Sequence, residues 1–155
     1  MKMNKEEKTV DSILARLFVT TLKIEERAAA RSFNNNLSIS EMHVLREIGI
    51  KDTKTMTQVA RGLKISVGAL TTAMNKLDMK GYVIRERDTT DRRIVNLCLS
   101  KEGRKAYDAH DAFHKQMVRS ALDELSEEEQ AIFLKSIIRL DAYFTEQWEK
   151  SRVKK

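Results

Sequence analysis

Residues 56–103 read MTQVARGLKISVGALTTAMNKLDMKGYVIRERDTTDRRIVNLCLSKEG. This stretch contains two short helical patterns separated by a turn around Gly62, followed by two strand patterns joined by a charged loop. Elements in that order are typical of a winged helix-turn-helix, whose second helix enters the major groove of DNA. We therefore expect a mainly α fold with a small β-wing.

The two helical patterns have apolar inner faces, because their apolar residues recur at intervals of three and four. These residues are Val59, Ala60 and Leu63 in the first helix and Leu70, Met74 and Leu77 in the second. We expect Thr57 to cap the first helix and Ser66 to cap the second, since hydroxyl oxygens accept bonds from free helix N–H groups. Gly81 fits the glycine that commonly follows a helix end.

The outer face of the second helix carries short polar side chains, which can bond base edges and let the backbone approach phosphate. Together with neighbouring polar residues and the wing, they form the predicted DNA-binding set. Its members are Thr57, Gln58, Ser66, Gly68, Thr71, Thr72, Asn75, Lys76, Asp91, Arg92 and Arg93. We expect Thr71 and Thr72 to lie near the groove floor.

The loop ERDTTDRR, residues 86–93, connects strand patterns at Tyr82–Arg87 and Ile94–Leu99, and six of its eight residues are charged. An isolated loop of this kind is usually an ordinary exposed hairpin tip. Directly after a helix-turn-helix, it is placed to bring guanidinium groups to phosphates or into a minor groove. We therefore interpret it as a DNA-contacting wing.

Residues 68–104 resemble the recognition helix and wing of the MarR family of bacterial repressors. The resemblance depends on the helix exit Leu77…Gly81-Tyr82-Val83, the Asp91-x-Arg93 motif of the wing, and LSKEG at 99–103 opening the next helix. With the flanking helices included, the resemblance covers nearly the whole chain. It implies that Asp91 holds the wing arginine in place and that Arg93 contacts the DNA backbone or minor groove.

A single MarR-type domain is expected over residues 1–155, with its winged helix-turn-helix at about 38–103 and dimerisation helices at about 10–31 and 104–150. The helices at both ends are apolar over a wide arc, more than one small winged domain can cover. Two copies can cover these faces across a two-fold axis. The predicted homodimer spaces two recognition helices about one DNA turn apart, so a palindromic operator is expected.

Composition favours a polyanionic partner, because 29 Lys and Arg residues stand against 23 Asp and Glu, for a net charge of +6. Double-stranded DNA is the partner we expect. No apolar run reaches the length of a membrane span, and the N-terminal residues lack the apolar core of a signal peptide. The lone cysteine fits a reducing compartment. These features predict a cytoplasmic protein with no membrane partner.

Enzymatic and metal chemistry are not expected. The sequence shows neither a serine, histidine and acid arrangement nor a glycine-rich phosphate loop. His110 and His114 are four residues apart on a predicted helix, but two imidazoles need a third ligand, and neither Asp111 nor His43 is an evident one. Cys98, on a wing strand without a partner cysteine, is expected to be structural rather than redox-active. We therefore predict no metal and no bound cofactor.

Four segments are similar to the branch of the family that represses fatty-acid synthesis genes: KIEE at 23–26, SISEMH at 38–43, LSKEGR at 99–104 and FHKQMV at 113–118. That resemblance implies a long acyl chain, carried on acyl carrier protein, as a corepressor that tightens DNA binding. The residues predicted to line its cavity are Ile24, Ala28, Met42, Leu45, Phe113 and Met117. Ordinary core packing is the plainer interpretation of the same residues.

Two other functions stay open. One is a repressor of the same family that a small aromatic or other ligand releases from DNA. In that case the ligand weakens DNA binding, whereas a corepressor tightens it. The other is a winged-helix protein used chiefly for protein assembly, which a gel-shift experiment with competitor DNA would reveal. The basic wing and the polar outer helix face favour DNA binding.

Overall fold

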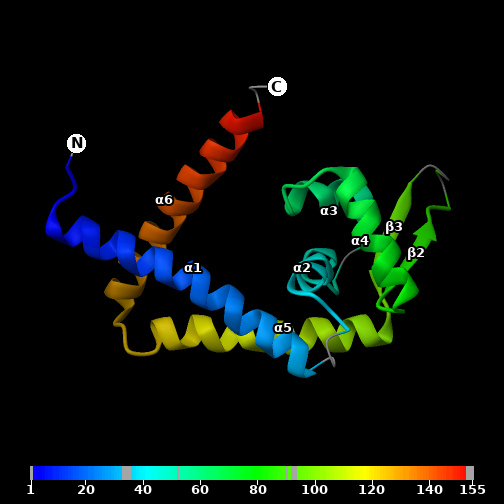
Figure 1. Cartoon of the computed structure of the whole chain (residues 1–155), viewed down its shortest axis with the longest axis horizontal. Coiled ribbons are helices and arrows are strands. Elements are labelled where there is room, and N and C mark those ends of the chain that lie inside the picture. The colour runs from blue at the N-terminus through cyan, green and yellow to red at the C-terminus, as the bar shows by residue number, and fades with distance from the viewer. Residues whose placement is uncertain (1, 33–35, 52, 90, 92–93, 153–155) are drawn as a thin grey trace. The chain divides into compact units, whose positions relative to one another are not determined.

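The computed structural model describes residues 2–32, 36–51, 53–89, 91 and 94–152. Its elements follow one another along the chain as in Figure 1. They are α1 (Lys5–Ser32), α2 (Ile39–Ile48), β1 (Lys54–Thr55), α3 (Met56–Gly62), α4 (Val67–Met79), β2 (Val83–Arg87), β3 (Val95–Leu99), α5 (Lys101–Leu122) and α6 (Glu127–Arg152). The fold is mainly α with a small β-wing, as expected.

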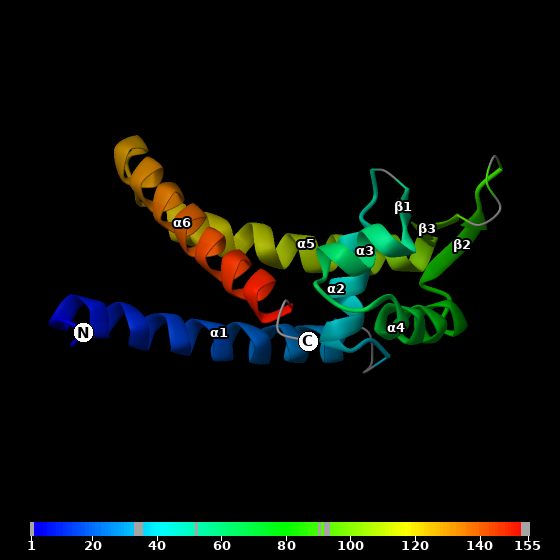
Figure 2. The same ribbon diagram turned by 90° about the horizontal axis from the view of Figure 1, so that it is seen from above.

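The chain forms two compact units, Met1–Ala112 and Phe113–Lys155, and α5 crosses the boundary between them. Within the first unit, α2, α3 and α4 pack against one another and against the small sheet, as Figures 1 and 2 show. The predicted helix-turn-helix and wing therefore belong to one unit.

Helix α3 starts one residue before the predicted cap, so the assignment of Thr57 was wrong. The hydroxyl of Thr55 accepts a hydrogen bond from the backbone N–H of Gln58, and the Gln58 side chain accepts one from the Thr55 N–H. Such a reciprocal box requires Glu or Gln three residues after the cap. Ala60 follows Thr57 at that spacing and has no side-chain acceptor.

Both predicted boundaries of α4 are confirmed, whereas α1 begins at Lys5, earlier than the predicted start near residue 10. Ser66 caps α4, with its hydroxyl accepting from the Ala69 N–H at 3.1 Å. Gly81 follows the end of α4 with a φ of +76°, a conformation that favours glycine. The inner face of α4 is buried as expected, because Leu70, Met74 and Leu77 are fully inaccessible to solvent.

The sheet has the order β1-β3-β2, and all of its neighbours are antiparallel. Val83 pairs with Leu99 and Arg87 with Val95, so the two predicted strands form the wing hairpin. Each strand begins one residue later than expected. The two-residue strand β1, which pairs with β3 through Leu97 and Asn96, was not predicted because two residues show no periodicity.

The core of the first unit lies between α2, α3, α4 and β3. Its fully buried side chains are Leu45, Ile48, Val59, Leu70, Met74, Leu77 and Leu97. Each contributes about 1.5–3 kcal/mol to folding through removal of apolar surface from water. This core holds α4 by one face and leaves its outer face exposed.

In the second unit, a capping box starts α6: the Ser126 hydroxyl accepts from the Glu129 N–H, and the Glu129 carboxylate accepts from the Ser126 N–H. The helix itself begins at Glu127, directly after this cap. Its long apolar side chains remain exposed, among them Ile132, Phe133, Ile137, Tyr143, Phe144 and Trp148. None of the helices in the described ranges combines the length and apolar character that crossing a membrane requires.

Candidate nucleic-acid interface

The outer face of α4 presents hydroxyl groups on consecutive residues. The Thr71 hydroxyl donates to the Val67 carbonyl oxygen at 2.8 Å, and the Thr72 hydroxyl donates to the Gly68 carbonyl oxygen at 3.3 Å. Thr72 is exposed, whereas Thr71 is half-buried. Because each hydroxyl proton is directed to the helix backbone, the oxygen lone pairs face outward as acceptors for a base amino group.

The N-terminus of α4 is open to an anion. Ser66 and Gly68 are exposed, and a Cβ at Gly68 would approach only the Ser66 hydroxyl, at 3.9 Å. Helix N-termini carry partial positive charge and free N–H groups, which suit a phosphate. The exposed Lys76 adds a full positive charge farther along the same helix. The local chemistry is that of a surface that follows a DNA strand.

Arg85 of β2 contacts the candidate site residue Asn75, and sequence reasoning missed it. Its guanidinium donates to the Asn75 side-chain oxygen at 2.7 Å and lies 3.7 Å from the Asp78 carboxylate. The wing strand is thereby tied to the recognition helix. Because Asn75 accepts from Arg85 with its oxygen, its amide NH₂ group is the part available for a base edge. Ten residues separate this pair, a spacing that no helical or strand pattern reveals.

The two candidates at the start of α3 have different roles. Gln58 uses its side-chain oxygen in the capping box with Thr55. Thr57 is exposed and is not the cap. Both remain candidates for phosphate contact from the first helix of the helix-turn-helix.

The tip of the wing is organised by Asp88. Its carboxylate accepts hydrogen bonds from the Asp91 backbone N–H at 2.9 Å and from the Asn96 side chain at 3.3 Å. Backbone bonds between Asp91 and Ile94 and between Ile94 and Asp88 close the hairpin. Arg92 and Arg93 lie outside the described residues, so their DNA contacts and the role of Asp91 in holding an arginine stay predictions.

The six residues of the predicted acyl cavity fall in both units. Met42 and Leu45 are buried in the core of the first unit, with exposed fractions of 2% and 0%. On α1, Ala28 is half-buried and Ile24 is exposed. Phe113 and Met117 belong to the second unit. The acyl cavity stays a prediction. For Met42 and Leu45, the structure fits the plainer interpretation, which is ordinary core packing.

Residues 37–95, which contain the helix-turn-helix and most of the wing, match the model of the MarR family. The chain is also similar to a solved structure of Streptococcus pneumoniae FabT in complex with DNA. The identity is 36%, the TM-score is 0.82, and the match covers 90% of this chain and 98% of FabT. The chain belongs to the MarR family. The expected family resemblance, drawn from the recognition helix and wing, is confirmed.

Curated relatives of this MarR-family chain include YwhA of Bacillus subtilis, named an HTH-type transcriptional regulator, at 28% identity over 87% of this chain and 94% of the relative. A second regulator of the same organism, YkoM, is 26% identical over 84% of this chain and 85% of its own length. Like these relatives, this MarR-family chain is a transcription regulator and not an enzyme.

Proposed function

We propose that this MarR-family regulator is a homodimeric repressor that binds a palindromic operator through α4 and the wing. In this proposal, a long acyl chain on acyl carrier protein tightens operator binding, and the regulated genes are those of fatty-acid synthesis. The observation that carries the proposal is the exposed polar face of α4. The chain also has the same fold as FabT, which was solved in complex with DNA and is 36% identical in sequence.

The proposed dimer is supported by apolar side chains that the chain itself leaves uncovered. On α1, Leu17, Phe18 and Leu22 are each about half exposed. Beyond the groove described below, α6 carries a similar set in Tyr143, Phe144 and Trp148. Exposed apolar surface of this extent is unfavourable in water unless a second protein surface covers it. A second copy of the chain would cover the apolar faces of both helices. The resulting dimer would have the two-fold symmetry of a palindromic operator.

An apolar ligand is supported by a groove of about 590 Å³ in the second unit. Its lining is mostly aliphatic and comes from the end of α5 and from α6, with Met117, Val118, Leu122, Phe133, Leu134 and Ile137 among its residues. Grooves of this size hold small ligands, and flexible methionine side chains adapt to an alkyl chain. Met117 is the predicted cavity residue that lines this groove.

The test measures operator affinity of the full chain with and without long-chain acyl carrier protein, against random DNA as competitor. The proposal predicts tighter operator binding with the acylated carrier and no change with the unacylated carrier. Release from DNA would instead favour the rival mechanism, in which a ligand lifts repression. Failure to discriminate operator from random DNA would contradict sequence-specific repression itself.

A variant links the ligand effect to the groove. Met117→Trp is expected to remove the acyl response, because the larger side chain fills the groove, while ligand-free DNA binding remains. The control Lys76→Ala should do the reverse, weakening DNA binding while the acylated carrier still binds. Coupling is reciprocal, so operator DNA must tighten carrier binding by the factor by which the carrier tightens DNA binding.

A further inference from the structure

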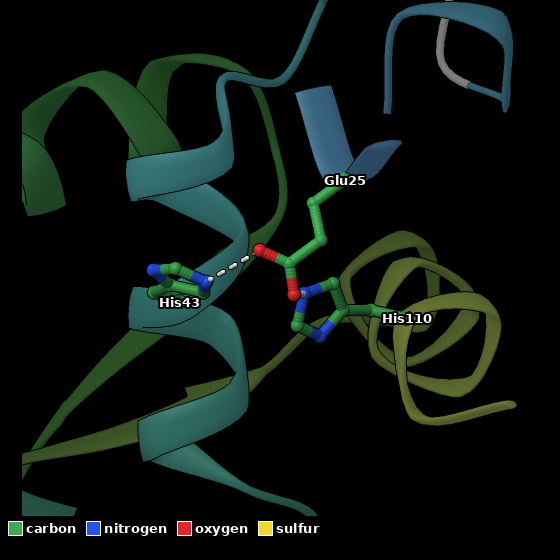
Figure 3. Close-up of side chains that lie close together, drawn as sticks. All are labelled: Glu25, His43 and His110. Carbon is green, nitrogen blue, oxygen red and sulfur yellow. Dashed lines mark ion pairs between the residues drawn. The ribbon is translucent and has the colours of Figure 1, made fainter. Parts of the chain in front are cut away.

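Three side chains from three helices of the first unit meet at one point: Glu25 of α1, His43 of α2 and His110 of α5. Figure 3 shows the Glu25 carboxylate between the two imidazoles. Glu25 Oε2 lies 3.5 Å from His43 Nε2, and Glu25 Oε1 lies 3.7 Å from His110 Nε2. One ligand atom from each residue lies within 4.8 Å of the other two.

The spacing of these atoms suits a shared metal ion. Both separations exceed the 2.7–3.2 Å of a good N–H···O hydrogen bond. Ligand atoms that each lie about 2.0–2.1 Å from a tetrahedral zinc ion are roughly 3.4 Å apart. The two imidazole rings meet edge to face, with centroids 5.7 Å apart, so they are not stacked. The two carboxylate–imidazole separations, 3.5 and 3.7 Å, are therefore close to those of a coordination shell.

The burial and the charge of these three side chains also favour a metal ion. The side chains of Glu25 and His110 are 3% and 6% exposed, whereas that of His43 is 39% exposed. A buried carboxylate requires positive charge close by, because its desolvation is costly. Imidazole nitrogens are the commonest protein ligands of transition metal ions. A divalent cation would add positive charge beside this carboxylate, and the half-exposed His43 leaves a route for it.

We propose that Glu25, His43 and His110 bind a divalent transition metal ion. Zn²⁺ fits best, because two imidazoles and one carboxylate form a common zinc ligand set that leaves one position for water. This site differs from the pair weighed in the sequence, since His110 meets Glu25 and His43 rather than relying on His114. It is independent of the proposed DNA and acyl functions.

The ion would join α1 and α5 to α2, which packs against α3, α4 and β3. Binding to the folded state alone stabilises that state by mass action. The experiment therefore has two readouts on the full chain after removal of metal with a chelator. We expect Co²⁺ to give the visible absorption of a protein-bound ion, which Zn²⁺ then displaces, and we expect Zn²⁺ to raise Tm.

Two variants test the ligands. Glu25→Gln keeps the shape of the side chain, and His43→Gln changes a half-exposed position that the fold tolerates. Each is expected to weaken Zn²⁺ binding more than about 100-fold, because loss of an outer-shell partner alone costs about 10- to 100-fold. Cys98→Ser is the matched control, since it removes the free thiol on β3 and should leave the affinity unchanged.

The proposal is overturned if Zn²⁺ changes neither the cobalt spectrum nor Tm between pH 6 and 8. It is also overturned if both variants bind Zn²⁺ as tightly as the parent chain, or if Cys98→Ser removes binding. Circular dichroism of the metal-free variants separates loss of a ligand from loss of the fold, and neither outcome depends on DNA binding.

Discussion

At the scale of single residues, the side chains that we propose to face DNA differ in the contact that each can make. Thr72 offers an oxygen acceptor on a short side chain, which suits a base edge. Lys76 offers a mobile charge, which suits a phosphate. Arg85 is engaged within the protein and positions Asn75. Sequence discrimination and overall affinity should therefore depend on different residues.

Replacing Thr72 with Ala is expected to reduce discrimination between operator and random DNA by about 1–3 kcal/mol, because one base contact is lost. Lys76→Ala, the comparison variant, should weaken binding to both DNAs equally and lower the salt slope by about one. Fluorescence anisotropy at several salt concentrations measures both quantities. An equal loss on all sequences for Thr72→Ala would make Thr72 a phosphate contact.

Glu41 gives stability a predictable pH dependence. Burial acts to raise the pKa of its carboxyl group, but bonds from the Lys80 ammonium and from the Ser38 backbone outweigh it, so the pKa lies below its ordinary value. Lys80 Nζ donates to both carboxylate oxygens, at 2.8 and 2.9 Å. A depressed folded-state pKa stabilises the fold above the unfolded pKa, and this contribution is lost as pH falls through the folded value.

Glu41→Gln should therefore lower the free energy of unfolding by about 1.5–3 kcal/mol at pH 7, the range for hydrogen bonds to charged groups. The difference from the parent should narrow as pH falls below about 4.3, the ordinary glutamate pKa. Urea unfolding across pH measures it. Glu102→Gln is the control, because the exposed Glu102–Lys105 pair contributes little. A difference that stays constant down to pH 2 would refute the charge-pair explanation.

At the scale of elements, the start of α5 is anchored to the end of α4. The Ser100 hydroxyl donates to the Gly81 carbonyl oxygen at 2.7 Å and accepts from the Gly103 N–H at 3.0 Å, while the Ser100 N–H donates to the Tyr82 carbonyl oxygen. A Cβ at Gly103 would overlap that Tyr82 oxygen. This close approach explains the glycine in the LSKEG segment.

Gly103→Ala is expected to destabilise the chain by about 1–3 kcal/mol, the cost of overpacking, because a backbone oxygen must shift. Gly68→Ala is the matched control: it also lies in the first turn of a helix, but its Cβ would only reach ordinary contact with the Ser66 hydroxyl, at 3.9 Å. That control should leave stability unchanged or raise it, since alanine favours helix. Thermal unfolding compares the two. Equal stability of both variants would show that α5 adjusts without strain.

At the scale of the whole molecule, the exposed apolar faces of α1 and α6 are the largest feature that one chain leaves unexplained. Deleting residues 141–155 removes Tyr143, Phe144 and Trp148, and it is expected to give a monomer or an aggregate. Light scattering after size-exclusion chromatography measures the mass. Deleting only residues 153–155 should preserve the dimer. A dimer that survives the longer deletion places the interface on other residues.

The sequence alone determined the local structure of this chain. Helix α4, its Ser66 cap, its apolar inner face and Gly81 after its end depend on residues within a few positions of one another. The wing hairpin joins two strands that follow each other along the chain, so strand periodicity and one loop predict it. Such features follow from short-range periodicity and capping. The family resemblance lay in the same contiguous motifs. The one misplaced cap, Thr57 for Thr55, was an error of register.

Only the tertiary structure decided which distant residues meet. Glu25, His43 and His110 come from three helices, and Arg85 reaches Asn75 because the wing folds back onto α4. β1 became visible as a strand only through its pairing with β3. These contacts depend on the packing angles and registers of whole elements, which many side chains set together. No spacing along one element encodes them, and so the candidate metal site required the fold.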